Sequence, residues 1–102
     1  MRKDDLIRAI GKYPNNTTVI MEWFQEGLTL LGTISTIYET DNGKVEGTPS
    51  YCEYYACAFR VKSVMENLGR GVYPPGSLIE ISADTAPNSI TLEDGTIVWE
   101  MM

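Results

Sequence analysis

The stretch that decides the fold is Tyr-Cys-Glu-Tyr-Tyr-Ala-Cys-Ala-Phe-Arg-Val-Lys-Ser-Val, residues 51–64. Side chains of a β-strand alternate between two faces. One face of a strand here would be apolar and would comprise Tyr51, Tyr55, Cys57, Phe59 and Val61. The other face would run from aromatic to basic, with Cys52, Tyr54, Ala56, Ala58, Arg60 and Lys62. As a helix, the stretch would have no apolar stripe. We therefore expect a central strand with one core face and one face for a helix or a ligand.

The residues before this strand predict one helix and two strands. Apolar spacing favours a helix from about Asp4 to Lys12, capped by Asp4 or Asp5 and ended by Tyr13-Pro14. Strands are expected at residues 17–24 and 28–40, joined by a tight reversal at residues 25–27.

Alternation predicts which side chains of these two strands share a face. The first strand would place Val19, Met21 and Trp23 on one face. The second would place Leu28, Leu30, Ile34 and Tyr38 on one face. Gly32 lies on that same face, which predicts a bulge or the close approach of a helix.

The chain after residue 40 alternates polar connections with strands. Residues 41–50 contain Asn42-Gly43 and predict a hairpin tip. Residues 63–68 fit either a helical turn, through the capping-box spacing of Ser63 and Glu66, or a strand that continues to Met65. A loop at residues 67–76 then leads to strands at residues 77–82, 90–92 and 96–99.

The 102 residues are expected to form a single α+β domain, residues 1–102, with the N-terminal helix packed on an antiparallel sheet of five to six strands. One helix cannot cover both faces of such a sheet. We expect Trp23, Tyr38 and Trp99, with Tyr54, to populate the uncovered face. A second copy of the chain would cover it, so the sequence predicts a homo-oligomer, most simply a dimer.

The composition excludes several classes of function. A net charge of −6 argues against binding to duplex nucleic acid, which needs many lysines and arginines. The chain has no histidine, the commonest general base and metal ligand, and its carboxylates show no metal or acid–base spacing. We expect neither enzymatic activity nor a cofactor or metal site.

The cysteines and the N-terminus predict a location. Cys52 and Cys57 are five residues apart, a spacing that would put them on opposite faces of a strand and so disfavours a disulfide between them. Two reduced thiols, with no signal peptide and no membrane span, predict a cytoplasmic protein.

The candidate ligand site combines cations with aromatic rings. Arg60, Arg70 and Lys62 would hold an anion such as phosphate, while Tyr54 and Tyr73 would stack on a base. Glycines of the loop at residues 69–76 would add backbone amides. In the alternative interpretation, Arg60 and Lys62 are the solvated end of a strand and Tyr73 only anchors a loop.

The acidic surface is a further candidate, because acidic proteins can occupy the basic nucleic-acid channels of larger enzymes. The acids, however, are scattered along the chain with no dense block.

The N-terminal helix, its stop at Tyr13-Pro14-Asn15-Asn16 and the strand that follows resemble the start of small phage and prophage proteins. Such proteins include anti-defence factors, among them the anti-Thoeris and anti-CBASS nucleotide sponges. The resemblance implies a non-enzymatic oligomer in the host bacterial cytosol that sequesters a cyclic nucleotide or an ADP-ribose-derived signal. Two alternatives remain: a protein–protein inhibitor of a host defence complex or nuclease, and a structural phage component.

Overall fold

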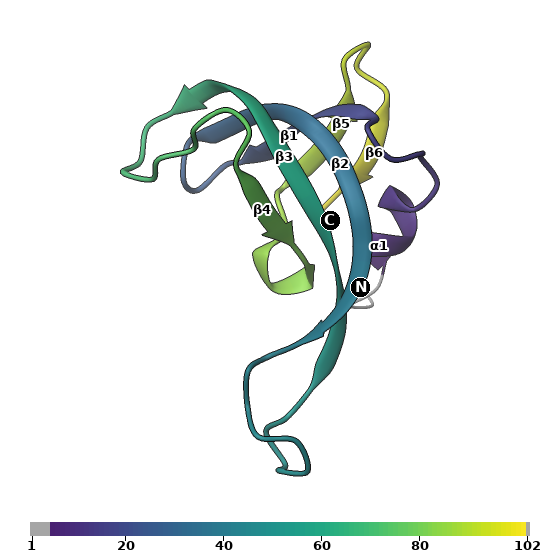
Figure 1. Ribbon diagram of the computed structural model, residues 1–102. Coiled ribbons are helices and arrows are strands. Elements are labelled where there is room, and N and C mark those ends of the chain that lie inside the picture. The colour runs from purple at the N-terminus through teal and green to yellow at the C-terminus, as the bar shows by residue number, and fades with distance from the viewer. Residues whose placement is uncertain (1–4, 102) are drawn as a thin grey trace.

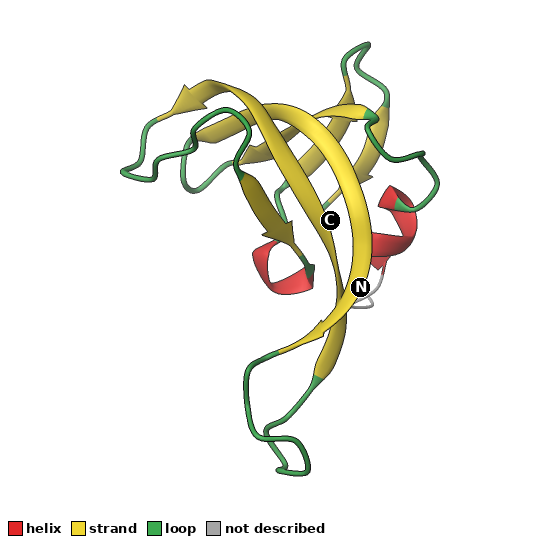
Figure 2. Ribbon diagram, in the orientation of Figure 1, coloured by secondary structure: helices red, strands yellow, loops and turns green. Residues whose placement is uncertain are grey.

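The computed structural model describes residues 5–101 and consists of one curved antiparallel sheet with a short helix (Figures 1 and 2). The six strands follow the order β4-β3-β2-β1-β5-β6. The elements are α1 (Asp5–Ile10), β1 (Thr18–Trp23), β2 (Leu28–Asp41), β3 (Glu53–Asn67), β4 (Leu78–Ile81), the 3-10 turn η1 (Ala83–Thr85), β5 (Ser89–Leu92) and β6 (Ile97–Glu100). The predicted combination of a helix with an antiparallel sheet is confirmed, although the helix has only six residues and the sheet makes up most of the fold.

The core lies on one face of the sheet, where α1 packs against it. The buried apolar side chains are Leu6, Ile7, Ile10, Val19, Met21, Leu28, Leu30, Ile34, Cys57, Phe59, Val61, Ile81, Ile90 and Trp99. Alternation explains the pattern, since every second residue of β1 and of the central part of β3 is buried. The predicted core face of the central strand is confirmed for Cys57, Phe59 and Val61, whereas Tyr55 is exposed.

The hairpin of β2 and β3 extends well beyond the other strands (Figure 1). We call its outer part, residues 38–56, the arm. The two strands stay paired up to Asp41 and Glu53, and residues 41–50 are all exposed. The predicted hairpin tip is confirmed, but it stands on a two-stranded ribbon that projects from the body of the protein.

A β-bulge in β2 corrects the expected position of Tyr38. Ile34 lies opposite Phe59 and Ile37 lies opposite Cys57, so β2 has one residue more than β3 in this interval. An extra residue reverses the alternation beyond it. Tyr38 therefore shares neither the face of Ile34 nor the core, and it lies on the outer face opposite Ala56.

Gly32 marks a second irregularity, as its position predicted. The strand register shifts between Leu31 and Gly32. A Cβ atom on Gly32 would lie 2.6 Å from the Phe59 ring and would also collide with the carbonyl oxygen of Arg60. The close neighbour is thus the adjacent strand β3, and not a helix.

Residues 63–67 belong to β3, so the alternative of a helical turn after Ser63 is wrong. The reason is pairing: Ser63 lies opposite Leu31, and Asn67 lies opposite Leu28. The backbone groups of these residues already pair with β2 as a strand. An isolated helical turn would therefore offer them no better hydrogen bonding. The predicted cap at Asp4 lies outside the described residues.

Candidate interaction surface

The outer face of the sheet carries a carboxylate held by two tyrosines. The Tyr38 hydroxyl donates to Oε1 of Glu80 at 2.9 Å, and the Tyr54 hydroxyl donates to Oε2 at 3.1 Å. Tyr38 comes from β2, Tyr54 from β3 and Glu80 from β4. The three side chains meet because the strand registers put them on the same face. The base of the arm is thereby tied to the edge strand of the sheet.

The same contacts raise the pKa of both phenols. Burial is the largest cause for Tyr38, followed by its hydrogen bond to Glu80 and the charge of that carboxylate, and together they raise the pKa to about 12. The hydrogen bond to Glu80 is the largest cause of the raised pKa of Tyr54. Both phenols therefore stay protonated, and able to donate, well above neutral pH.

Two cavities open beside β4 and η1. The larger, of about 370 Å³, is lined by Trp23, Glu26, Leu28, Tyr73, Ile79, Glu80, Asp84, Thr85 and Ala86. The smaller, of about 230 Å³, is lined by Cys52, Glu53, Tyr54, Tyr55, Ser82, Ala83 and Asp84. Asp84 lines both cavities. We call the surface around them, with the carboxylates of Glu26, Glu53, Glu80 and Asp84, the acidic edge.

Positive charge does not balance the acidic edge within the described part of the chain. Among residues 5–101, no lysine or arginine lines either cavity. Within residues 5–101, none of its four carboxylates takes part in an ion pair, and all four residues are exposed. Such a concentration of one sign of charge attracts cationic groups and repels anions.

The ring of Trp23 is fixed at the wall of the larger cavity. Its Nε1 donates to the carbonyl oxygen of Thr85 at 3.2 Å, and the backbone amide of Phe24 donates to the Asn88 side chain at 2.7 Å. Tyr73 lines the same cavity and packs against the core. A rigid indole and a phenol next to carboxylates suit a ligand with apolar and cationic parts.

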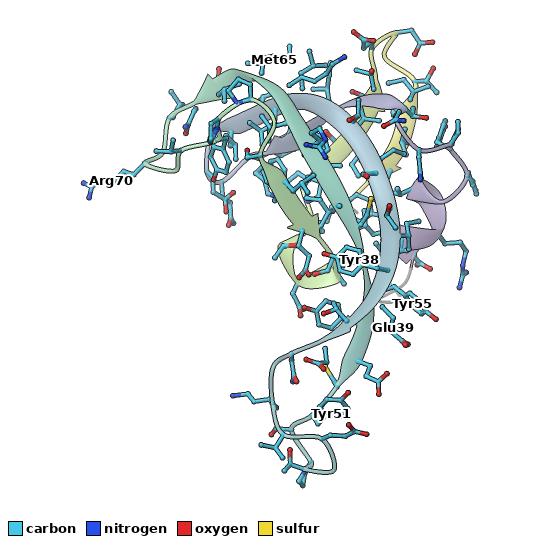
Figure 3. All side chains as sticks on the ribbon, viewed as in Figure 1. Tyr38, Glu39, Tyr51, Tyr55, Met65 and Arg70 are labelled. Atoms are coloured by element: carbon cyan, nitrogen blue, oxygen red, sulfur yellow. The ribbon has the colours of Figure 1, made fainter. Side chains whose placement is uncertain are left out.

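The predicted anion site is dispersed. Tyr73 and Tyr54 line the acidic edge, whereas Arg60, Lys62 and Arg70 line neither cavity. Arg60 donates to the carbonyl oxygen of Gly76 at 3.0 Å. It lies six positions, roughly 20 Å, from Tyr54 along β3. Lys62 is exposed, and Arg70 points away from the body of the protein (Figure 3).

The predicted interface residues divide in a similar way. Trp99 is 7% exposed and belongs to the core on β6, the strand that α1 contacts, so its place on an uncovered face is wrong. Alternation explains the difference, because Trp99 lies opposite the buried Ile90. Trp23 and Tyr38 are partly exposed near the acidic edge. The predicted homo-oligomer stays a prediction.

The sequence interpretation considered Glu80 and Asp84 only among carboxylates whose spacing supports no site, and did not choose them as site residues. Glu80 is the polar residue of the strand Leu-Ile-Glu-Ile, and strand alternation alone assigns it to the outer face. Asp84 follows in a short turn, and no spacing in the sequence links either residue to Tyr38, Glu26 or Glu53.

Cys52 is exposed and Cys57 is buried, and both thiols are free, as their spacing predicted. Burial raises the pKa of the Cys57 thiol. No helix within residues 5–101 is long and apolar enough to span a membrane.

The fold and the site define a small, sheet-dominated α+β protein with an acidic, aromatic-lined edge. The chain belongs to the family of cognate immunity proteins YxxD, whose family model matches residues 1–102. Searches of curated proteins and of solved structures gave no match. The expected class of small accessory protein is confirmed in this broad sense, whereas the narrower expectation of a nucleotide sponge stays a prediction.

Proposed function

We propose that this protein binds a cognate toxin directly and neutralises it, and that the acidic edge is the surface that the toxin contacts. Membership of a family of cognate immunity proteins supports a toxin as the partner. The observation that supports the acidic edge is its set of four exposed carboxylates, which form no ion pair with any described residue and line two cavities with aromatic walls.

The toxin surface that fits this edge carries lysines or arginines. Complementary charge accelerates association and rejects partners of the wrong sign. Trp23 and Tyr73 supply the rigid aromatic area that commonly carries most of the binding free energy at an interface. Enzymes that act on nucleic acids need basic clefts to hold phosphates. A nuclease whose cleft this acidic edge covers is therefore the toxin class that we propose.

Two tyrosines give the edge a fixed geometry. Because Glu80 accepts hydrogen bonds from Tyr38 and Tyr54, its carboxylate loses little conformational freedom when a cation binds. Asp84 lies between the two cavities and has no such restraint among the contacts of the described residues. We assign Glu80 the role of a positioned acceptor and Asp84 that of an adaptable one.

Charge-reversal variants test the proposal. The variants Asp84→Lys and Glu53→Lys are compared with Glu93→Lys, an exposed acid in the turn between β5 and β6. Affinity for the purified cognate toxin is measured by calorimetry at two salt concentrations, and cell growth is measured during co-expression of the toxin.

Each reversal at the edge should weaken toxin binding about tenfold or more and reduce the protection of growth, because it places a like charge against the toxin. Glu93→Lys should bind like the unmodified protein. Urea unfolding shows that each variant is folded. Equal affinity for all three variants would contradict the assignment of the acidic edge.

A further inference from the structure

The edge strand β4 has backbone groups that no other strand uses. Within residues 5–101, β4 ends the sheet and pairs only with β3. Val61 donates its amide hydrogen to the carbonyl oxygen of Ser77 at 2.9 Å. Hydrogen-bonded pairs recur at every second residue of an antiparallel ladder, so Ile79 and Ile81 also face β3. The backbone groups of Leu78 and Glu80 consequently point to the free edge.

One of these outward groups is already satisfied. The Thr85 hydroxyl donates to the carbonyl oxygen of Glu80 at 3.1 Å, which agrees with the outward direction of that carbonyl. Within residues 5–101, no hydrogen bond engages the amide of Leu78, its carbonyl oxygen or the amide of Glu80. Two donors and one acceptor therefore lie in a row along the free edge.

We propose that the toxin adds one antiparallel strand to β4 and that this strand alternates basic and apolar residues. The inference rests on the proposed function, because it specifies how the toxin engages the acidic edge. Addition of a strand to an exposed sheet edge is a general mode of recognition, in which backbone hydrogen bonds give affinity and pockets give specificity. The antiparallel orientation continues the arrangement of the whole sheet.

The alternation follows from the two faces of β4. Residues of the added strand that share the outer face lie beside Glu80, whose carboxylate selects lysine or arginine. Residues that share the core face lie beside Ile79 at the larger cavity, where Trp23 and Tyr73 provide apolar walls. Leu78 is 57% exposed on the outer face and can cover the aliphatic part of a basic side chain.

Synthetic peptides test the strand itself on the unmodified protein. The probe is the heptapeptide Lys-Val-Lys-Val-Lys-Val-Lys, aligned so that two of its lysines lie opposite Leu78 and Glu80. In an antiparallel pair with Glu80, the amides of the lysines point toward β4 and those of the valines point away. We therefore compare this peptide with two versions, one methylated at the lysine amides and one at the valine amides.

The unmodified and the valine-methylated peptides should bind and slow hydrogen exchange at the amides of Leu78 and Glu80 by about tenfold. The peptide that is methylated at the backbone amides of its lysines should do neither, because this methylation removes the amide donors that face β4. Equal behaviour of the two methylated peptides, or a loss confined to the valine-methylated peptide, would overturn the proposal.

A matched pair of variants separates this inference from the proposed function. Leu78→Pro removes an outward amide without removing a bond to β3, and edge strands tolerate proline. Leu78→Val keeps the amide. Leu78→Pro should weaken toxin binding about tenfold, and Leu78→Val should change it less than about twofold. If Asp84→Lys weakens toxin binding and Leu78→Pro does not, the strand addition is wrong and the acidic edge stands. If neither variant weakens binding, both proposals fail.

Discussion

The Tyr38 hydroxyl lies 2.9 Å from Oε1 of Glu80 and donates a hydrogen bond across 42 positions of the chain. Tyr54 donates to the other oxygen of the same carboxylate. An isolated two-stranded ribbon is marginally stable in water. The arm therefore depends on this carboxylate for its attachment to the edge strand, and the edge strand depends on the arm for the position of Glu80.

Replacing Tyr38 by Phe should lower the free energy of unfolding by about 1–2 kcal/mol, because the hydrogen bond to a charged acceptor is lost while the ring stays in place. Urea unfolding measures the change. Tyr55→Phe is the matched control, since Tyr55 is 54% exposed and its hydroxyl has no hydrogen bond within the described residues. The control should change stability by less than about 0.5 kcal/mol. A Tyr38→Phe variant as stable as the control would show that the bond to Glu80 contributes nothing.

Alkaline titration should reveal the raised pKa of Tyr38. The folded protein holds this proton with a pKa of about 12, against 10.0 for an ordinary tyrosine. Since the folded state binds the proton more tightly than the unfolded chain, the resulting stability is complete below pH 10 and is lost as the pH rises through 12. Tyrosinate absorbance should show a late-titrating group that is absent in Tyr38→Phe. An identical titration curve for both proteins would contradict the assignment.

Gly32→Ala should destabilise the protein by about 3 kcal/mol, at the upper end of the usual cost of overpacking. The added methyl group would collide with the Phe59 ring and with the backbone of Arg60, and backbone cannot move aside as a flexible side chain can. Gly69→Ala is the control, because its Cβ would have no neighbour closer than 3.6 Å. Thermal or urea unfolding of both variants checks the difference, and equal stability would mean that β2 and β3 can separate at low cost.

Trp99→Ala should cost about 3–5 kcal/mol of stability, as expected for truncation of a buried aromatic side chain. Toxin affinity per folded molecule should remain unchanged, because the ring belongs to the core. Trp23→Ala should mainly lower the affinity for the toxin, because Trp23 lines the larger cavity. Calorimetric titration corrected for the folded fraction distinguishes the two. Loss of affinity in folded Trp99→Ala would restore Trp99 as an interface residue.

The two thiols should react at different rates with a thiol-specific disulfide reagent. Cys52 is exposed and should react at once, whereas Cys57 is buried, with a raised thiol pKa, and should react only upon unfolding. Cys52→Ser should therefore remove the fast phase. Two fast phases in the unmodified protein would show that β3 opens around Cys57.

The sequence predicted the sheet well, because alternation of apolar residues directly reports a half-buried strand. It placed Cys57, Phe59 and Val61 in the core correctly. It wrongly placed Tyr38 on the same face as Ile34, because a single extra residue in β2 moves every later side chain to the opposite face of the sheet. Bulges depend on how two strands pair, and one strand read by itself does not contain that information.

The candidate site was harder to predict because it is assembled from separate strands. Arg60 and Tyr54 belong to one stretch and suggest one pocket, but a strand rises roughly 3.3 Å per residue and holds them apart. Glu26 lines the larger cavity and Glu53 the smaller one, and Asp84 reaches both through the pairing of β3 with β4 and the return of η1 toward Trp23. Acids that are scattered in the sequence thus line two cavities that share Asp84.

The pairing of β1 with β5 has a consequence for the order of events during synthesis. Val19 lies opposite Leu92, and Trp99 completes the core close to the C-terminus. Contacts between such distant segments form slowly and only when both segments exist. A chain in which residues 89–100 have not yet been synthesised therefore cannot close this core.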